Sequence, residues 1–415
     1  ALKEDMQGSM NEGKLFTPFT LGPLNLKNRS IRAAAFEGMC PGNLASDQLL
    51  NYHRAVAAGG VGMTTLAYAS VCRSGLSFPH QLWLRKEAIT GLRSITNAVH
   101  AEGAAASVQI GHCGNMSKKS VAGQTPLGAS TGFNMYSPTW ARGMRYDEIK
   151  EMAVNFGQAV HTAREAGFDA VEVHAGHGYL ISQFLSPWTN RRKDEYGGSP
   201  ENRMRFMKEM MQAVMEAAGG DMAVIVKINM HDGFRGGMET DECLEVAGVL
   251  EKMGVHALVL SGGFVSKAPM YVMRGEMPVR TLTHYMENPW LKIGIRMFGH
   301  MMIPGHPYKE AYFLDDALKF RQKLKLPLIY VGGLLSRQTI EGVLDQGFEM
   351  VSMARALLHD PAFISKLKNG TEQRSACKHS NYCIARMYSK EMACHHSIEG
   401  LPASLRREIE KAERE

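Results

Sequence analysis

Three side chains that could bind a polarised oxygen or move a proton lie close together in the sequence. His174 ends an apolar, β-branched run that begins at Ala170, and His177 and Tyr179 follow it. An imidazole can donate a hydrogen bond to a carbonyl oxygen, and a phenol can deliver a proton. At the carboxyl end of a parallel strand, several loops can reach one ligand. The spacing therefore predicts a site for carbonyl recognition and protonation.

Other interpretations of these three side chains stay open at this point. A histidine among apolar residues can be a structural core residue, and a His-x-x-His pair could ligate a metal. No third ligand lies at a suitable spacing from His174 and His177, so we expect no metal there. Tyr179 could be a buried tyrosine whose hydroxyl is satisfied by the core.

The elements that must position these residues follow a repeating pattern. Short β-branched or apolar runs alternate with longer helical patterns, which is typical of βα units and a parallel sheet. No GxGxxG motif follows the first runs, which disfavours a doubly wound dinucleotide fold. Eight strands are predicted, the number that a closed (β/α)8 TIM barrel needs. They are Ser30–Ala35, Gly62–Leu66, Ala105–Ile110, Ala170–His174, Val224–Ile228, Ala257–Ser261, Leu328–Gly332 and Met350–Met353.

Two segments interrupt this alternation, and we expect them to be long βα-loop insertions. Gly111–Arg145 is rich in Gly, Ser and Pro and is predicted to be a loop over the strand ends. Phe264–Tyr312 is predicted to cap the pocket. Within it, Trp290–Met302 could alternatively be a membrane-surface or partner helix. The second insertion is rich in methionine, which either adapts to a bulky apolar ligand or fills gaps in a core. These methionines are Met273, Met277, Met286, Met297, Met301 and Met302.

The stretch around the histidines resembles the old yellow enzyme family. The motif His174-x-x-His177-x-Tyr179 is followed without gaps by Gln183–Pro187 and Asp194–Ser199. The resemblance implies an FMN-binding (β/α)8 barrel that takes hydride from NADH or NADPH and reduces activated C=C bonds. It also implies that the two histidines grip the substrate oxygen and that Tyr179 is the proton donor.

Flavin-binding residues follow from the late strands and from the resemblance. Loops after the seventh and eighth strands form the recurrent phosphate site of such barrels, so Gly332, Gly333, Ala354 and Arg355 are expected at the FMN phosphate. The resemblance places further residues at the flavin ring, where Gln109 would meet the pyrimidine edge and Lys227 would supply charge in place of the arginine of many relatives. Small or aromatic residues are also expected at the cofactor: Ala33, Ala34, Ala35 and Tyr68.

Three cysteines near the C-terminus resemble the iron–sulfur region of larger relatives such as dienoyl-CoA and enoate reductases. Cys377, Cys383 and Cys394 are present, but Ser380 stands where a fourth cysteine is needed, so an iron–sulfur cluster is not expected. Nearby histidines could complete a zinc site, although we expect none: His379, His395 and His396. Little sequence follows, so we expect no second, FAD-binding domain, and electrons should reach FMN directly from NADH or NADPH.

Composition narrows the class of protein. The chain has 415 residues, 21% charged and 45% hydrophobic, with a formal net charge of +6 that is not gathered in a basic run. Nucleic-acid binding is therefore not expected. No apolar segment of roughly 18 residues and no secretion signal is present, which predicts a cytoplasmic protein. Seven cysteines in so long a chain are expected to be reduced. Residues 1–9 are expected to be a cloning remnant, with native sequence from Met10.

These observations together predict one barrel over residues 10–370 and a C-terminal extension over residues 371–415 with a charged helix. The expected activity is reduction of the C=C bond of an enone or enoate-type compound, bulky and apolar if the methionines line the pocket, and the protein could form a homo-oligomer. An amine dehydrogenase or demethylase on the same scaffold is an alternative, but its substrate offers no carbonyl oxygen to the histidines. A non-catalytic flavin-binding interaction module is a second alternative, although it would need no convergent donors.

Overall fold

Eight parallel strands close into a barrel, as predicted. The computed structural model describes residues 13–414, so the expected cloning remnant and the start at Met10 lie outside the described residues. Each strand pairs with the next one along the chain, and the last pairs with the first. The strands are β3 (Ser30–Arg32), β4 (Met63–Ser70), β5 (Ala105–Gly111), β9 (Ala170–His174), β10 (Ala223–Asn229), β11 (Ala257–Ser261), β12 (Leu328–Val331) and β13 (Met350–Met353).

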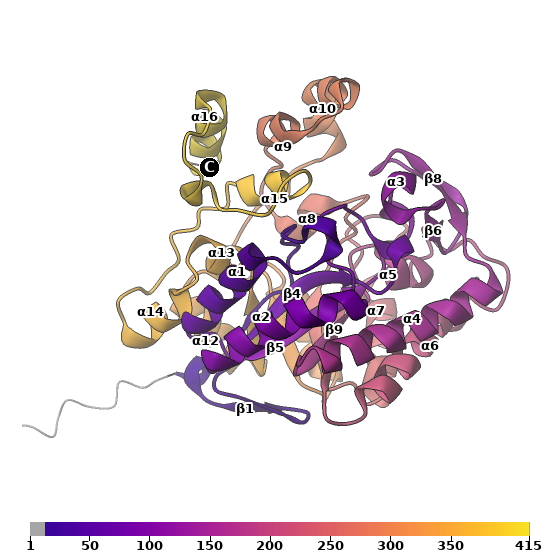
Figure 1. Ribbon diagram of the computed structural model, residues 1–415, viewed down its shortest axis with the longest axis horizontal. Coiled ribbons are helices and arrows are strands. Elements are labelled where there is room, and N and C mark those ends of the chain that lie inside the picture. The colour runs from indigo at the N-terminus through magenta and orange to yellow at the C-terminus, as the bar shows by residue number, and fades with distance from the viewer. Residues whose placement is uncertain (1–12, 415) are drawn as a thin grey trace, which may run out of the picture.

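A helical segment follows every strand and covers the outside of the barrel (Figure 1). Local sequence explains where such a helix begins and ends. In α6, Ser199 caps the first turn by accepting from the Asn202 N–H, Pro200 occupies the first helical position, and Gly219 ends the helix at φ 65°. The covering helices are α1 (Asp47–Ala58), α2 (Ile89–Ala101), α4 (Tyr146–Glu165), α6 (Pro200–Ala218), α7 (Thr240–Lys252), α11 (Leu314–Lys323), α12 (Arg337–Asp345), α13 (Arg355–His359) and α14 (Phe363–Asn369).

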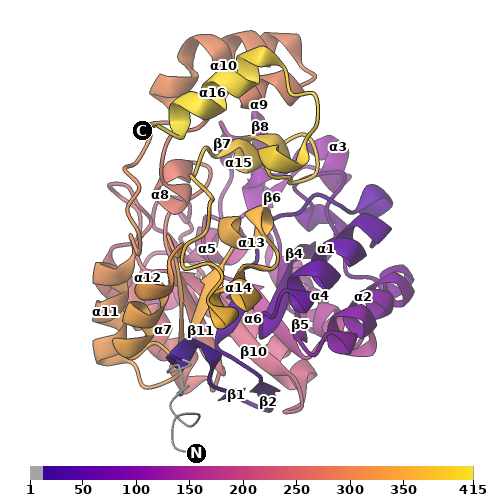
Figure 2. The ribbon, with the colours of Figure 1, turned by 90° about the vertical axis from the view of Figure 1, so that its left-hand side faces the viewer.

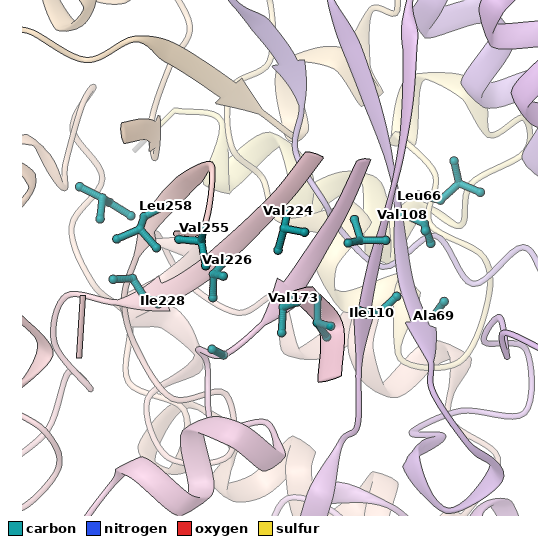
Figure 3. Close-up of a cluster of buried hydrophobic side chains, with 14 of the residues drawn as sticks. Leu66, Ala69, Val108, Ile110, Val173, Val224, Val226, Ile228, Val255 and Leu258 are labelled. Atoms are coloured by element: carbon teal, nitrogen blue, oxygen red, sulfur yellow. The ribbon is translucent and has the colours of Figure 1, made fainter. Parts of the chain in front are cut away.

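Strand residues alternate between two apolar layers. One layer lies between the sheet and the helices, and Figure 3 shows part of it, including Val108, Val173 and Val226. The other layer fills the barrel interior and receives a residue from every strand. Its strand members are Ile31, Met63, Ala105, Ala170, Ala223, Ile225, Ala257, Val259, Ile329 and Met350. A hairpin of β1 (Phe19–Leu21) and β2 (Leu24–Leu26) closes this end of the barrel (Figure 2).

The first strand is shorter than predicted. It ends at Arg32, although the Ala33 N–H still donates to the Met353 carbonyl at 2.8 Å. The Arg32 guanidinium then bonds the carbonyl oxygens of Thr65, at 2.7 Å, and Ala35, at 3.0 Å. The chain therefore bends over the barrel rim after Ala33 instead of continuing the ladder.

The first insertion is more ordered than the predicted loop. After the short helix α3 (Lys119–Ala122), it forms a small sheet of β6 (Leu127–Gly128), β7 (Gly132–Asn134) and β8 (Thr139–Gly143). Strands β7 and β8 pair antiparallel. Its Gly, Ser and Pro content obscured these strands, because they are short and have few periodic apolar positions.

The second insertion and the C-terminal extension pack together above the barrel (Figure 2). The insertion forms α8 (Pro269–Met273), α9 (Val279–Tyr285) and α10 (Pro289–Met302), and the extension forms α15 (Tyr382–Met387) and α16 (Ala403–Ala412). Three of the predicted ligand-facing methionines pack against the extension: Met273, Met277 and Met286. Three others are exposed on α10: Met297, Met301 and Met302. None of the six joins the apolar cluster that contains Tyr179.

The charged helix at the end of the chain is α16, and it is amphipathic instead of exposed on all sides. Leu405 and Ile409 are buried against Tyr382. Glu408 accepts hydrogen bonds from the backbone N–H groups of Arg280 and Thr281 at the start of α9. Within residues 13–414, no helix combines the length and the apolar character needed to cross a membrane.

Candidate active site

His174, His177 and Tyr179 converge at the carboxyl end of β9, as predicted from their spacing. The ring centroids of His174 and His177 are 5.0 Å apart, and those of His174 and Tyr179 are 4.3 Å apart. The chain turns back between them because His177 and Gly178 adopt positive φ angles of 57° and 78°. A Cβ atom at Gly178 would also collide with the ring of Phe264. Glycine at this position therefore allows the turn that brings Tyr179 to His174.

Hydrogen bonds orient both imidazoles. The Gly176 N–H donates to His174 Nδ1 at 3.3 Å, so a neutral His174 carries its proton on Nε2 and can donate from there. His177 Nε2 lies 2.7 Å from the hydroxyl of Ser261, at the end of β11. The His177 backbone N–H donates to Asn229 Oδ1 at 2.9 Å, at the end of β10. Three strands therefore hold this pair in place.

Burial decides the protonation states at the site. It is the main cause that lowers the pKa of both imidazoles, to about 3 for His177, and the charge of Lys227 acts in the same direction. Both rings are therefore neutral near pH 7 and act as uncharged donors. Burial also raises the pKa of Tyr179, followed by the effect of Tyr388. The phenol stays protonated and keeps a proton to donate.

A buried polar chain lies beside the histidines, inside the barrel. Gln109 Nε2 donates to Glu172 Oε1 at 2.6 Å, and the same oxygen lies 2.8 Å from Lys227 Nζ. Lys227 Nζ also reaches the carbonyl oxygen of Ala34 at 3.5 Å. The structure thus brings Gln109, Lys227 and Ala34 together, and their contact with a flavin ring stays a prediction. Glu172 was missed, although an acid two residues before His174 in a buried strand shares its face and could have indicated it.

Aromatic rings surround Tyr179 at the mouth of the barrel. Tyr68, a predicted cofactor residue, has its ring 4.9 Å from that of Tyr179, and its hydroxyl bonds to Ser77. Tyr388, which follows α15 in the C-terminal extension, has its ring 5.9 Å from that of Tyr136. Tyr136 and Tyr388 were not predicted, because each lies in a segment without a recognisable motif. The extension therefore contributes directly to the mouth of the site.

The residues expected at the phosphate gather on another side of the rim. Gly332 and Gly333 follow β12 with φ of 130° and 69°, and Ala354 and Arg355 follow β13. Added Cβ atoms at either glycine would press against the ring of Tyr312. Burial raises the pKa of Tyr312, and the nearby Arg355 opposes this rise. Tyr312 thus links the two predicted phosphate segments in space.

Arg355 and its neighbours could still donate hydrogen bonds to a ligand. Arg355 Nη1 donates to Asn381 Oδ1 at 2.6 Å, and its guanidinium lies 5.9 Å from the ring centroid of Tyr308. Among the described residues, the buried hydroxyl of Tyr308 has no hydrogen-bond partner. An anion at this side of the rim could accept from Arg355 and from this hydroxyl.

The C-terminal cysteines line one small cavity beside Arg355. Cys377, Ser380, Cys383 and Cys394 all contribute to it. Cys394 Sγ also lies 3.5 Å from His359 Nδ1. All seven cysteines are free thiols. The fold therefore brings the three C-terminal cysteines and Ser380 to one cavity. That they hold no iron–sulfur cluster stays a prediction.

Comparisons with known proteins agree with this architecture. A model of the NADH:flavin oxidoreductase / NADH oxidase family matches residues 14–294. A 4,4'-dithiodibutanoate disulfide reductase from Rhodococcus erythropolis is 40% identical over 376 residues, which cover 90% of this chain and 93% of that protein. An NADH oxidase from Thermoanaerobacter brockii is 30% identical over 86% of this chain, but this chain spans about half of its length, 51%.

A solved structure shows the same fold along the whole barrel. Morphinone reductase in complex with tetrahydroNAD superimposes with a TM-score of 0.68 at 25% identity, over 88% of this chain and 92% of that one. The family model and the R. erythropolis relative each cover well over half of the sequence. The chain belongs to the NADH:flavin oxidoreductase / NADH oxidase family, which includes the old yellow enzymes.

Proposed function

We propose that this protein reduces the C=C bond of an α,β-unsaturated carbonyl compound, using FMN and hydride from NADH or NADPH. Membership of the family supports the flavin and the nicotinamide. The observation that carries the proposal is the convergence of two neutral imidazoles and one protonated phenol at the barrel mouth. Reduction of an enone needs donors for its oxygen and a proton for its α-carbon.

The residues present fit a flavin mononucleotide. A phosphate is suited by Arg355, by the positive-φ backbone at Gly332 and Gly333, and by the Tyr308 hydroxyl, which has no partner among the described residues. Gln109 and Lys227 suit the polar edge of the ring, with Lys227 held by Glu172. The chemistry that FMN supplies when bound is hydride transfer.

In this proposal, the histidines recognise the substrate and Tyr179 completes the reaction. His174 Nε2 and His177 donate hydrogen bonds to the carbonyl oxygen and stabilise the negative charge that develops there. Since both rings are neutral, neither loses a proton to the substrate, and the α-carbon takes its proton from Tyr179. The aromatic ring of Tyr68 beside Tyr179 favours a flat, unsaturated substrate. None of the six methionines of the second insertion packs in the apolar cluster around Tyr179, so they give no support to a preference for a bulky substrate.

Reduction of an organic disulfide is a second candidate, favoured by the identity to a 4,4'-dithiodibutanoate disulfide reductase over almost the full chain. Delivery of hydride to one sulfur would break the S–S bond and release a thiol and a thiolate. Tyr179 is placed to protonate that thiolate, so the same acid would serve both reactions. The amine reaction is less well supported, because it uses no oxygen clamp.

The first experiment identifies the cofactor and the half-reactions. The purified protein is examined for bound FMN and titrated without oxygen with NADH and NADPH. The reduced protein is then mixed with a size-graded series of enones and enoates and with 4,4'-dithiodibutanoate. Rapid reoxidation by enones supports the main proposal, and reoxidation by the disulfide alone supports the second. A protein that neither contains nor takes up FMN contradicts both.

Substitution of the proton donor tests the mechanism. Tyr179→Phe should slow reoxidation by enones by about 100- to 10,000-fold, the usual contribution of a positioned acid, while reduction by NADH or NADPH stays close to wild type. Tyr146→Phe, an exposed position on α4, is the matched control. Unchanged reoxidation of Tyr179→Phe would contradict the assigned role of Tyr179.

A further inference from the structure

Three metal-ligating side chains meet in the C-terminal extension, away from the barrel mouth. His395 and His396 lie on a 3₁₀ turn (His395–Ser397), and Glu413 follows α16. One ligand atom from each lies within 4.8 Å of the other two. His395 Nε2 is 3.2 Å from Glu413 Oε1, and the two imidazole rings are 4.0 Å apart. Seventeen positions separate His396 from Glu413, so only the fold brings these groups together.

From this geometry we propose that His395, His396 and Glu413 bind one divalent cation, with Zn²⁺ as the best match. Imidazole nitrogen and carboxylate oxygen are common zinc ligands, at about 2.0–2.2 Å from the metal. Two ligand atoms at those lengths in a tetrahedral site lie roughly 3.3 Å apart, which is close to the His395–Glu413 separation. Small side-chain rotations would therefore complete three of the four positions.

The fourth position has access to water. His395 and Glu413 line an open groove of about 480 Å³ between the 3₁₀ turn and α16. A water molecule from this groove can complete a tetrahedral zinc site that has three protein ligands. The cavity of Cys377, Cys383 and Cys394 is a separate feature that shares His395 at its edge. The proposed site uses none of those three thiols.

A cation here would fasten the segment that covers the active site. The extension reaches the barrel mouth through Tyr388, and the Met392 N–H donates to the Glu37 carbonyl at 2.7 Å. Further along, Glu408 of α16 caps α9. A metal between the 3₁₀ turn and Glu413 would join these two attachments, so cation binding should stabilise the covering segment.

Metal binding by the whole flavoprotein tests the site. The protein is treated with a chelator, dialysed, and titrated with ZnCl₂ by calorimetry, with the bound metal counted by elemental analysis. One zinc per chain and a raised melting temperature are expected. His396→Ala and Glu413→Gln should each weaken binding by about 100-fold or more, because loss of even a supporting partner of a ligand costs 10- to 100-fold.

Matched variants make the outcome decisive. His300→Ala and Glu151→Gln change exposed residues of the same types on α10 and α4, away from this groove, and should bind zinc like wild type. Flavin content and circular dichroism report whether each variant folds. Absence of zinc binding by the wild type would overturn the proposal. So would binding that survives both ligand substitutions, or binding that is lost in Cys377→Ser, which would move the metal to the thiol cavity.

An independent observation concerns helix α10, which lies at the top of the molecule in Figure 2 and exposes apolar side chains. Twelve large apolar side chains are exposed among the described residues, and six of them lie on this helix. Trp290, Met297 and Met301 are 82%, 68% and 77% exposed. Their spacing, together with Ile293, places them along one side of the helix. So large an apolar surface is typical of an interaction site.

The charge of α10 indicates what kind of surface its exposed apolar side would bind. The helix carries Lys292, Arg296 and His300, and no acidic residue occurs between Pro289 and Lys309, so its net charge is positive. Arg296 Nε donates to Thr283 Oγ1 of α9 and therefore does not lie on the exposed apolar side. An exposed apolar side on a helix of net positive charge suits the headgroup region of an anionic membrane. We propose that α10 docks this protein on an anionic lipid surface.

Vesicle binding tests the docking proposal. The flavoprotein should sediment with phosphatidylserine-containing vesicles and much less with pure phosphatidylcholine vesicles. Met297→Glu and Met301→Glu should each reduce partitioning by about tenfold, the value of one buried methionine. Met135→Glu, which is 65% exposed in the first insertion, is the control. No sedimentation with anionic vesicles would overturn the proposal, as would a dimer in light scattering that the same α10 substitutions dissociate.

Discussion

The two halves of the barrel interior differ sharply, although the same eight strands enclose both. The lower half is an apolar layer to which every strand contributes, from Ile31 to Met350. Two residues further along the same strands, and therefore on the same inward face, lie Ser107, Glu172 and Lys227. The inward-facing residues are therefore apolar near the amino ends of the strands and polar or charged near their carboxyl ends.

This difference separates residues that stabilise the fold from residues that build the site. Burial of apolar side chains contributes to stability directly. A buried ion pair such as Glu172–Lys227 contributes little net stability, because both charges lose their hydration. The polar half is therefore explained by binding and chemistry, and it should respond to substitution differently from the apolar half.

The largest effect is expected where one charge of the polar half is removed. Lys227→Met leaves Glu172 charged and unpaired in the interior, which should lower the free energy of unfolding by about 3–5 kcal/mol. It should also reduce the FMN retained after purification. Urea denaturation and flavin absorbance measure both effects. The double variant Glu172→Gln/Lys227→Met should recover most of the stability, and a single variant as stable as wild type would show that the pair is not buried in solution.

A cavity in the apolar half should reduce stability without affecting the flavin. Ile329→Ala removes a fully buried side chain from the lower layer and should cost about 3 kcal/mol of unfolding free energy. FMN bound per folded chain should match wild type, as determined by absorbance ratio at a temperature where the variant is folded. Loss of flavin in this variant would contradict the proposal that the apolar half serves stability and the polar half serves flavin binding.

Acid should destabilise the polar half through its histidines. The folded-state pKa values of His174 and His177 are below the unfolded value of about 6.5. The unfolded chain therefore binds more protons below about pH 6.5, so the stability from the neutral imidazoles is full above that pH. It is lost as the pH falls toward the folded pKa, about 3 for His177. Each histidine should contribute about 1.4 kcal/mol per pH unit in this window.

Unfolding free energies between about pH 7 and pH 5 measure this slope. His177→Asn keeps a hydrogen-bond donor, tolerates the positive φ of 57° and removes the titrating ring. The slope of this variant should be smaller than that of wild type by the share of one histidine. Equal slopes would mean that His177 is protonated normally in the folded protein.

The smallest effect is expected for a neutral hydrogen bond in the polar half. Ser261→Ala removes the hydroxyl that lies 2.7 Å from His177 Nε2 and should cost about 1 kcal/mol, or roughly fivefold in kcat/KM. Ser94→Ala is the control, because that hydroxyl is exposed on the outer helix α2, away from the barrel interior. Steady-state kinetics compare the two variants. Equal losses would show that orientation of His177 by Ser261 does not matter.

Much of the barrel could be predicted because its signals are local. Buried parallel strands appear as apolar runs between turn residues, so the bounds of β9, β11 and β13 agree with the prediction. The end of β3 could not be predicted, because it depends on the Arg32 guanidinium reaching carbonyl groups at Thr65 and Ala35. The short strands of the first insertion were missed for lack of periodic apolar positions.

The site was predicted where its residues are neighbours in sequence and missed where they are not. His174, His177 and Tyr179 share one strand end, so their spacing was enough to expect convergence. Glu172 could be recognised as a site residue only from its partner Lys227, which lies on the neighbouring strand β10. Tyr388 and Glu413 act through packing of the C-terminal extension, which no local pattern indicated.

The sequence by itself determined the order of the strands, where most of them lie, and the donors and small residues that follow β9, β12 and β13. Alternation along a strand and the chemistry of each side chain are local properties, and they need no knowledge of distant segments. Only the tertiary structure decided that His174 and His177 are neutral and that Lys227 is paired with Glu172. It also divided the methionines between a core and an exposed face. Burial and partnership depend on segments far apart in the chain, and these segments meet only after the barrel closes.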